Sequence, residues 1–226
     1  MKFSATALAF ASLVATAASK EEQEQNLRGL GGNSHGGSNE GKPEKWYRFG
    51  CNQPLEARLF DPGETLRSDA KDVPDTAVNG VVKFSCSDDW EWNGQLTKIE
   101  YRIEGLSDGL HGLHVHEYMI GGADGMDPED CASTGGHWNP EGTDHGTNLD
   151  FQRHIGDMAN IESINFDSEG GVAEGTLQAF IPLQSWLGIR GTAVVVHGGE
   201  DDLGLGGNNG SRANGNAGPR VGCGDI

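Results

Sequence analysis

Histidines cluster in one part of this 226-residue chain, and their spacing suits metal binding. The chain has 8 histidines, and all except His35 lie between residues 111 and 197. His114 and His116 belong to an apolar segment, and on a β-strand side chains two residues apart point to the same face. Two imidazoles placed in this way can bind one metal ion. A single His-x-His pair is weak evidence, because strands contain it by chance.

Further ligand types follow at positions that loops and strand ends can bring together. Imidazole is a ligand that both zinc and copper favour. Six imidazoles and one carboxylate are more ligands than one tetrahedral site uses, so we expect two ions. The candidate ligands are His114, His116, His137, His145, His154, Asp157 and His197.

Short apolar or alternating segments predict β-strands as the elements that position these ligands. No helical period persists for three turns. Two long glycine-rich interruptions, 119–156 and 198–219, are predicted to be loops, and loops of that length in a compact domain are usually functional or disordered. The predicted strands are Leu55–Phe60, Gly80–Cys86, Leu96–Ile103, Gly112–Glu117, Ala173–Phe180 and Gly191–His197.

The composition excludes several classes of protein. The 36 glycines have no three-residue period, which excludes collagen, and they are incompatible with a coiled coil. Much glycine with only 7% aromatic residues favours an all-β fold. The chain has 34 Asp+Glu against 16 Lys+Arg, a formal net charge of −18, and no run of basic residues. We therefore expect no nucleic-acid partner, because such proteins need a basic surface.

The N-terminal residues predict a secreted, extracellular protein. Lys2 precedes an uncharged apolar run that ends in small residues, which is typical of a secretory signal peptide over residues 1–18. The polar, glycine-rich segment 19–45 is predicted to be a disordered linker or pro-segment. No other segment reaches the length of a membrane span, so no membrane contact is expected after signal removal. Residues 46–226 are the predicted folded domain.

Five sequence blocks resemble those of the copper/zinc superoxide dismutases in content, order and spacing. The resemblance covers roughly residues 50–226 and implies an eight-stranded antiparallel Greek-key β-barrel with two long functional loops. It implies an oxidoreductase that binds one copper and one zinc ion per chain and converts superoxide to dioxygen and hydrogen peroxide. The blocks are Gly109–His116, Gly135–Pro140, Arg153–Asp157, Val195–Gly204 and Gly215–Gly224.

The resemblance also implies a role for each candidate ligand. Copper would alternate between Cu(II) and Cu(I), and zinc, whose d-shell is full, would hold the loop without redox change. His137 would bridge both metals and accept a proton when copper is reduced. The implied copper ligands are His114, His116, His137 and His197. The implied zinc ligands are His137, His145, His154 and Asp157.

Two further residues have roles that the resemblance implies. Asp201 is expected to link His114 and His145 by hydrogen bonds and so to hold both rings. Arg220 is expected to bind the superoxide anion beside copper, since its guanidinium is planar and permanently charged. Arg220 and His137 are therefore the expected catalytic residues. A surface ion pair is the structural alternative for Arg220.

The four cysteines of a secreted chain are expected to form disulfides, and four cysteines allow three connectivities. The family resemblance implies the pair Cys131 and Cys223. Cys51 and Cys86 would then form a second bridge. That second bridge lies outside the usual family pattern and rests only on the even count and the oxidising compartment.

The chain departs from the family pattern in its loops. Segment Glu117–Glu129 is longer than the family loop that helps to form the common homodimer, so the oligomeric state is left open. Gly199 and Ala213 stand where the family often has lysines, and Arg212 is the neighbouring cation. Superoxide is an anion and the net charge of the chain is −18. The local potential along the channel that leads to copper must therefore oppose the overall field of the protein. Asn209 begins a glycosylation sequon on the same loop.

Other functional classes explain less of the sequence. A zinc hydrolase needs an open zinc position and a carboxylate base, and Tyr118 stands where the metallo-β-lactamase-like pattern has Asp. A cupin oxidase leaves His137, His145 and His154 unexplained. A secreted metal-binding or structural protein on the same fold would keep the ligands and lose Arg220. A metal-delivery chaperone would lose copper ligands and prefer thiolates.

Overall fold

The computed structural model describes residues 54–60, 78–87, 96–127, 130–164 and 170–226, and all of them belong to one compact unit, Glu44–Ile226. The predicted signal peptide (1–18), the predicted linker (19–45) and Cys51 lie outside these ranges and stay predictions. No helix in the described ranges combines the length and the apolar character that a membrane crossing requires.

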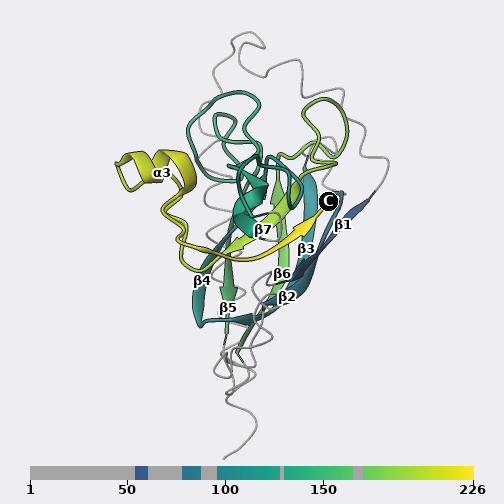
Figure 1. The fold of residues 1–226 in the computed structure, drawn as a ribbon, viewed down its shortest axis with the longest axis vertical. Coiled ribbons are helices and arrows are strands. Elements are labelled where there is room, and N and C mark those ends of the chain that lie inside the picture. The colour runs from purple at the N-terminus through teal and green to yellow at the C-terminus, as the bar shows by residue number, and fades with distance from the viewer. Residues whose placement is uncertain (1–53, 61–77, 88–95, 128–129, 165–169) are drawn as a thin grey trace, which may run out of the picture. The chain divides into compact units, whose positions relative to one another are not determined.

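Eight antiparallel strands form one sheet that curls into a nearly closed barrel (Figure 1), as predicted. Their order across the sheet is β5-β4-β7-β8-β1-β2-β3-β6. The edge strands β5 and β6 approach each other, and the isolated bridge between Ile164 and Val172 joins their ends. The order β3-β6-β5-β4 around the barrel is a Greek key. The strands are β1 (Leu55–Phe60), β2 (Asn79–Cys86), β3 (Thr97–Leu106), β4 (Gly109–His116), β5 (Asp157–Ser163), β6 (Gly171–Ala179), β7 (Ala193–His197) and β8 (Arg220–Asp225).

Alternating side chains decide which face of each strand lines the barrel interior. In β1, Leu55, Ala57 and Leu59 are buried, whereas Glu56 and Arg58 are exposed. The other strands contribute inward-facing apolar residues to the same core, and burying this surface is what stabilises the barrel. Among these core residues are Val82, Phe84, Ile99, Ile103, Leu113, Met158 and Val196.

Strands β4 and β7 are buried on both faces, and this places the histidines. Val115 packs in the barrel core, so its neighbours His114 and His116 point to the outer face of β4. Val196 of β7 is also in the core, and His197 follows it on the outer face. These three histidines are at most 4% exposed. The outer face must therefore be covered by other parts of the chain.

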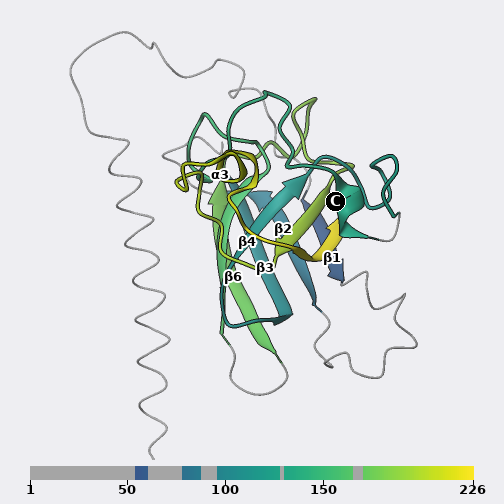
Figure 2. The ribbon, with the colours of Figure 1, turned by 60° about the vertical axis from the view of Figure 1, so that its left-hand side comes forward.

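Two long loops provide that cover. Segment 117–156, between β4 and β5, contains the short 3₁₀ helix η3 (Cys131–Thr134), and segment 198–219, between β7 and β8, contains α3 (Asn209–Asn214). Gly112 donates its N–H to Gly199 over 2.9 Å, which holds the second loop against β4 (Figure 2). A disulfide between Cys131 and Cys223 joins the first loop to β8, with the two Cα atoms 5.7 Å apart.

The six strands predicted from the sequence pattern are confirmed within a few residues, and β5 and β8 were not predicted from that pattern. In β5 a bulge interrupts the alternation, and Met158 and Ile161 both reach the core although they are three residues apart. In β8, Gly224 lies so close to β1 that a Cβ would be 2.1 Å from the Arg58 oxygen. Glycine at such a contact removes the apolar signal of a strand.

Candidate metal centre

All seven predicted ligands come together on the outer face of the barrel in two buried groups whose ligand atoms lie within 4.8 Å of one another. We call them the four-histidine group and the aspartate group. The four-histidine group comprises His114, His116, His137 and His197. The aspartate group comprises His137, His145, His154 and Asp157, so the two groups share His137.

A closed set of three backbone hydrogen bonds brings the contributing segments together. Val115 donates to Gly156 over 2.9 Å, Gly156 donates to Trp138 over 2.9 Å, and Trp138 donates to Val115 over 2.8 Å. Each of these residues is next to a candidate ligand, so the backbone itself places the ligands. The adjacent ligands are His114, His116, His137 and Asp157.

Hydrogen bonds in the four-histidine group leave one nitrogen of each ring facing the centre. The Nδ1 atoms of His116 and His197 lie 2.9 and 3.1 Å from the carbonyl oxygens of Gly135 and Gly218. Their Nε2 atoms face each other at 3.4 Å. Nδ1 of His114 and Nε2 of His137 are buried and have no hydrogen-bond partner. Four converging nitrogen lone pairs, without a carboxylate, make a donor set that fits copper.

In the aspartate group, three imidazole nitrogens converge on one carboxylate oxygen. Oδ1 of Asp157 lies 2.9, 2.8 and 3.3 Å from the Nδ1 atoms of His137, His145 and His154. Neighbouring ligands of a tetrahedral zinc ion are separated by about 3.3 Å when the metal–ligand bonds are about 2.0 Å long. Three imidazoles and one carboxylate at this spacing fit a closed zinc site.

His137 presents one ring nitrogen to each group. Its Nδ1 is 2.9 Å from Asp157 and 3.3 Å from the Nδ1 atom of His154. Its Nε2 is buried and has no hydrogen-bond partner, and the residue also belongs to the four-histidine group. The ring centroids of His114 and His137 are 4.0 Å apart. A single imidazole thus lies between two ligand sets.

Asp201 connects the two groups through hydrogen bonds to one histidine of each. Its Oδ2 lies 2.9 Å from Nε2 of His114, and its Oδ1 lies 2.8 Å from Nε2 of His145. Because these nitrogens donate to Asp201, the Nδ1 atom of each ring is left for the group that it faces. Asn160 in turn holds Asp201 by two hydrogen bonds of 2.8 Å to its backbone. Asn160 was not predicted, because only the folded chain brings β5 beside residue 201.

Burial keeps most of the imidazoles neutral. It is the largest cause that lowers the pKa of His114 and of His116 well below the usual value, and neighbouring imidazoles add to the shift. Burial also lowers the pKa of His137, and it lowers that of His197 to about 4. Neutral imidazole is the form that binds a metal, so the four-histidine group can bind an ion without first losing protons.

The carboxylates have the opposite effect on His145. Burial lowers its pKa, but hydrogen bonds to Asp157 and Asp201 outweigh burial and raise the pKa to about 9. Burial likewise raises the pKa of Asp157, while hydrogen bonds from His137, His145 and His154 hold it well below the usual value. Asp157 is therefore ionised at neutral pH and provides negative charge for a cation in this group.

Arg220 is half-buried beside the four-histidine group. Its Nη1 donates to Cys131 O, Ala132 O and Thr134 Oγ1 at 2.7–3.2 Å, and Nη2 donates to Gly135 O at 2.6 Å. These acceptors belong to η3 and the residue that follows it, so the disulfide of Cys131 also anchors the guanidinium. The positive charge of Arg220 contributes to the lowered pKa values of His116 and His197.

The second loop has its exposed cation on α3. Arg212 is exposed and donates to Oδ1 of Asn209. Asn209, the first residue of the sequon, is exposed, whereas the Ser211 hydroxyl is buried and donates to Asp202 over 2.8 Å. Within segment 198–219 the one cation that faces solvent is thus Arg212, and the half-buried Arg220 follows at the start of β8.

Comparisons with known proteins agree with this geometry. A family model described as copper/zinc superoxide dismutase matches residues 78–226. The chain is 41% identical over 150 residues to superoxide dismutase (Cu-Zn) A of Xenopus laevis, which covers 66% of this chain and 89% of that protein. It is 38% identical over 175 residues to extracellular superoxide dismutase (Cu-Zn) of Drosophila melanogaster, which covers 77% of this chain and 86% of that protein. The chain belongs to the copper/zinc superoxide dismutase family.

Proposed function

We propose that this chain is a secreted enzyme that converts superoxide to dioxygen and hydrogen peroxide. Copper is bound by the four-histidine group and zinc by the aspartate group. The observation that carries the proposal is the position of His137, which presents Nδ1 to the aspartate group and a buried, unpartnered Nε2 to the other histidines. A buried polar atom without a partner is costly, and a metal ion would satisfy it.

The donor sets distinguish the two proposed metals. Bound copper supplies a one-electron couple, Cu(II)/Cu(I), that superoxide can reduce and then reoxidise. The four-histidine group offers imidazole nitrogens alone, which suit copper. The aspartate group offers four protein ligands and so fills a tetrahedral zinc site, as structural zinc sites do. We therefore assign zinc the task of holding segment 137–157 in place.

Arg220 is the proposed binding residue for the superoxide anion. Four acceptors hold its guanidinium, yet its Nε and one hydrogen of Nη2 have no acceptor among the described residues. These hydrogens can donate to an anion that enters beside His116 and His197, the two histidines whose pKa values the charge of Arg220 lowers. Solvent also screens the attraction between a bound anion and this half-buried cation less than it would at an exposed cation.

His137 is the proposed proton carrier. Its Nε2 is buried and free of other protein partners, so this atom could hold a proton from solvent whenever it is not bound to copper, and could pass that proton to the reduced substrate. Asp157 keeps the other nitrogen of the ring oriented toward the aspartate group. The side chain can therefore return to the same position after each proton transfer.

Superoxide decay tests this proposal. The purified chain without residues 1–18, loaded with copper and zinc, is compared by stopped-flow absorbance with the same protein loaded with zinc alone. We expect rapid decay only when copper is present. Unchanged decay with both metals verified as bound would contradict catalysis and leave a secreted metal-binding protein. The N-terminal sequence of the exported protein tests the signal peptide at the same time.

A further inference from the structure

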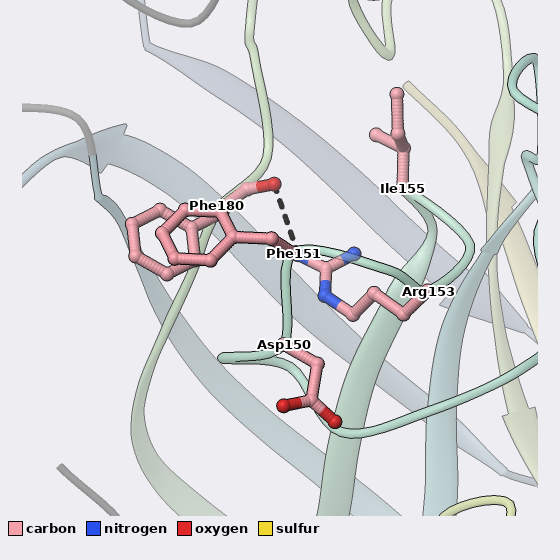
Figure 3. A pocket seen from close by; sticks show the side chains of 5 residues that line it. All are labelled: Asp150, Phe151, Arg153, Ile155 and Phe180. Carbon is pink, nitrogen blue, oxygen red and sulfur yellow. Dashed lines mark hydrogen bonds between the residues drawn. The ribbon is translucent and has the colours of Figure 1, made fainter. Parts of the chain in front are cut away.

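Arg153 is a buried cation next to the aspartate group that the proposed reaction does not use. It lines a small pocket together with Asp150, Phe151, Ile155 and Phe180, and only 3% of the residue is exposed (Figure 3). Burial lowers the pKa of Arg153 to about 10, so the guanidinium is still charged at neutral pH. No ion pair among the described residues includes Arg153. Burying a charge without a counter-ion in contact destabilises the fold, so we expect Arg153 to have a function that offsets this cost.

The guanidinium is bonded only to two main-chain oxygens. Nη1 donates to the carbonyl oxygen of His154, and Nη2 donates to that of Phe180 over 2.9 Å, while Nε has no partner. Figure 3 shows the side chain reaching toward the Phe180 oxygen, with the Phe151 and Phe180 rings stacked beside it. The two acceptors belong to segments far apart in the sequence. Arg153 therefore acts as a clamp between them.

One end of this clamp is the turn that carries two candidate zinc ligands. Asp157 N donates to His154 O over 3.1 Å, and His154 N donates to Oδ2 of Asp157 over 3.0 Å. Nη1 of Arg153 donates to the same His154 oxygen, so the guanidinium holds the turn at the atom that closes it. The other end is the connection that follows β6, which belongs to the barrel.

We propose that Arg153 is a positioning residue for the aspartate group, because its two-pronged guanidinium ties the His154–Asp157 turn to the end of β6. This inference rests on the proposed zinc site. The planar fork of arginine can reach two separate oxygens at once, whereas a lysine ammonium is a single point of charge. The clamp thus requires the shape of arginine and not only its charge.

Cobalt and zinc binding test the proposal without an activity assay. Copper-loaded, zinc-free protein is titrated with Co²⁺, which reports a tetrahedral site by its visible absorbance, and zinc affinity is then measured by competition with a chelator. The variants are Arg153→Gln and Arg153→Lys. We expect both to weaken zinc binding about 10–100-fold and to change the cobalt spectrum, as for other residues that orient metal ligands.

Phe151→Ala is the matched control. It removes the ring that stacks on Phe180 at a centroid distance of 4.8 Å but leaves both Arg153 hydrogen bonds. We expect a lower urea midpoint of the metal-free protein with unchanged zinc affinity. If Arg153→Gln does not fold, Arg153→Lys carries the test. Wild-type zinc affinity in Arg153→Lys, or in a folded Arg153→Gln, would overturn the clamp.

A further variant separates this inference from the function on which it rests. His154→Ala should abolish the cobalt spectrum if the aspartate group is the metal site. If the spectrum survives in His154→Ala, the proposed zinc site is wrong. If it is lost there but both Arg153 variants match wild type, only the role of Arg153 is wrong.

Discussion

Gly156 lies directly against Val115, so close that a Cβ on residue 156 would be 2.1 Å from the Val115 carbonyl oxygen. The two residues are also joined by the hydrogen bond from Val115 N to Gly156 O, 2.9 Å long. Asp157 follows the glycine, and Val115 stands between two histidines. The distance between β4 and the aspartate group is thus determined by the absence of a side chain at residue 156.

Gly156→Ala is expected to separate this contact. The methyl group cannot fit, so the His154–Asp157 turn must move away from β4, and overpacking of this kind costs about 1–3 kcal/mol. Urea unfolding of the metal-free protein measures the loss, and zinc affinity should fall as well. Gly136→Ala is the control, since its Cβ would find its nearest atom at 3.8 Å. Equal stability of the two variants would contradict this account.

Asp201→Asn is expected to weaken binding of both metals. The amide can accept a hydrogen bond from only one of His114 and His145, so one buried N–H loses its acceptor and that ring loses its orientation. Changes at such supporting residues typically reduce metal affinity about 10–100-fold. Chelator competition measures each affinity. Asp202→Asn is the control, because Asp202 contacts α3 and its neighbours but no imidazole.

Arg220→Gln is expected to slow superoxide decay at limiting substrate. It removes the half-buried cation beside the four-histidine group, and focused positive potential of this kind changes the rate of anion capture about tenfold or more. Stopped-flow measurements at several salt concentrations give kcat/KM, and the variant should depend less on salt. Arg212→Gln, an exposed cation on α3, should have a smaller effect. A larger loss in Arg212→Gln would reverse the assignment.

Replacing both Cys131 and Cys223 with serine is expected to affect stability and activity together. The bridge closes a sequence separation of 92 residues, and removal of a native disulfide typically costs about 2–5 kcal/mol. Since Cys131 O accepts from Arg220, the guanidinium should also become less well ordered. Thermal unfolding and kcat/KM measure the two effects. Loss of stability with fully retained kcat/KM would separate the disulfide from Arg220.

The metal-free protein is expected to lose stability as the pH falls below about 6.5. The folded pKa of His197 is about 4 and those of His114 and His116 are also lowered, so between these values the unfolded chain binds protons that the folded chain does not. His197 alone contributes a loss of ~3 kcal/mol between pH 6.5 and 4. The raised pKa of His145 adds stability as the pH falls from about 9 to 6.5, and this contribution to the free energy of unfolding is constant below 6.5.

Urea unfolding at pH 7.5, 6 and 4.5 checks this slope. His197→Gln lacks the titrating ring and should show a shallower decrease than wild type over the same range. A free energy of unfolding that stays constant from pH 7.5 to 4.5 would show that the imidazoles are not held neutral by burial.

Most strands and the candidate metal ligands could be predicted from the sequence alone. Six strands follow from segments that alternate in polarity or run apolar, and the shared face of the His-x-His pair follows from the two-residue period of a strand. The spacing of six histidines and Asp157 was enough to expect two metal ions. These features are local, because each depends on residue type and on neighbours a few positions away.

The relative placement of the ligands depends on contacts between distant segments. The junction of Val115, Trp138 and Gly156 joins three parts of the chain through backbone atoms, which leave no trace in residue type except the glycine. Residue type alone does not show that Arg153 is buried, and its Phe180 acceptor comes within reach only once the end of β6 lies beside the turn. Strands β5 and β8 were hidden for a related reason, since a bulge and two glycines break their pattern. The sequence by itself determined which side chains could bind metals. Only the tertiary structure decided which ring nitrogen of His114, His116, His145 and His197 faces its ligand group, because Asp201 and backbone carbonyls accept a hydrogen bond from the other nitrogen.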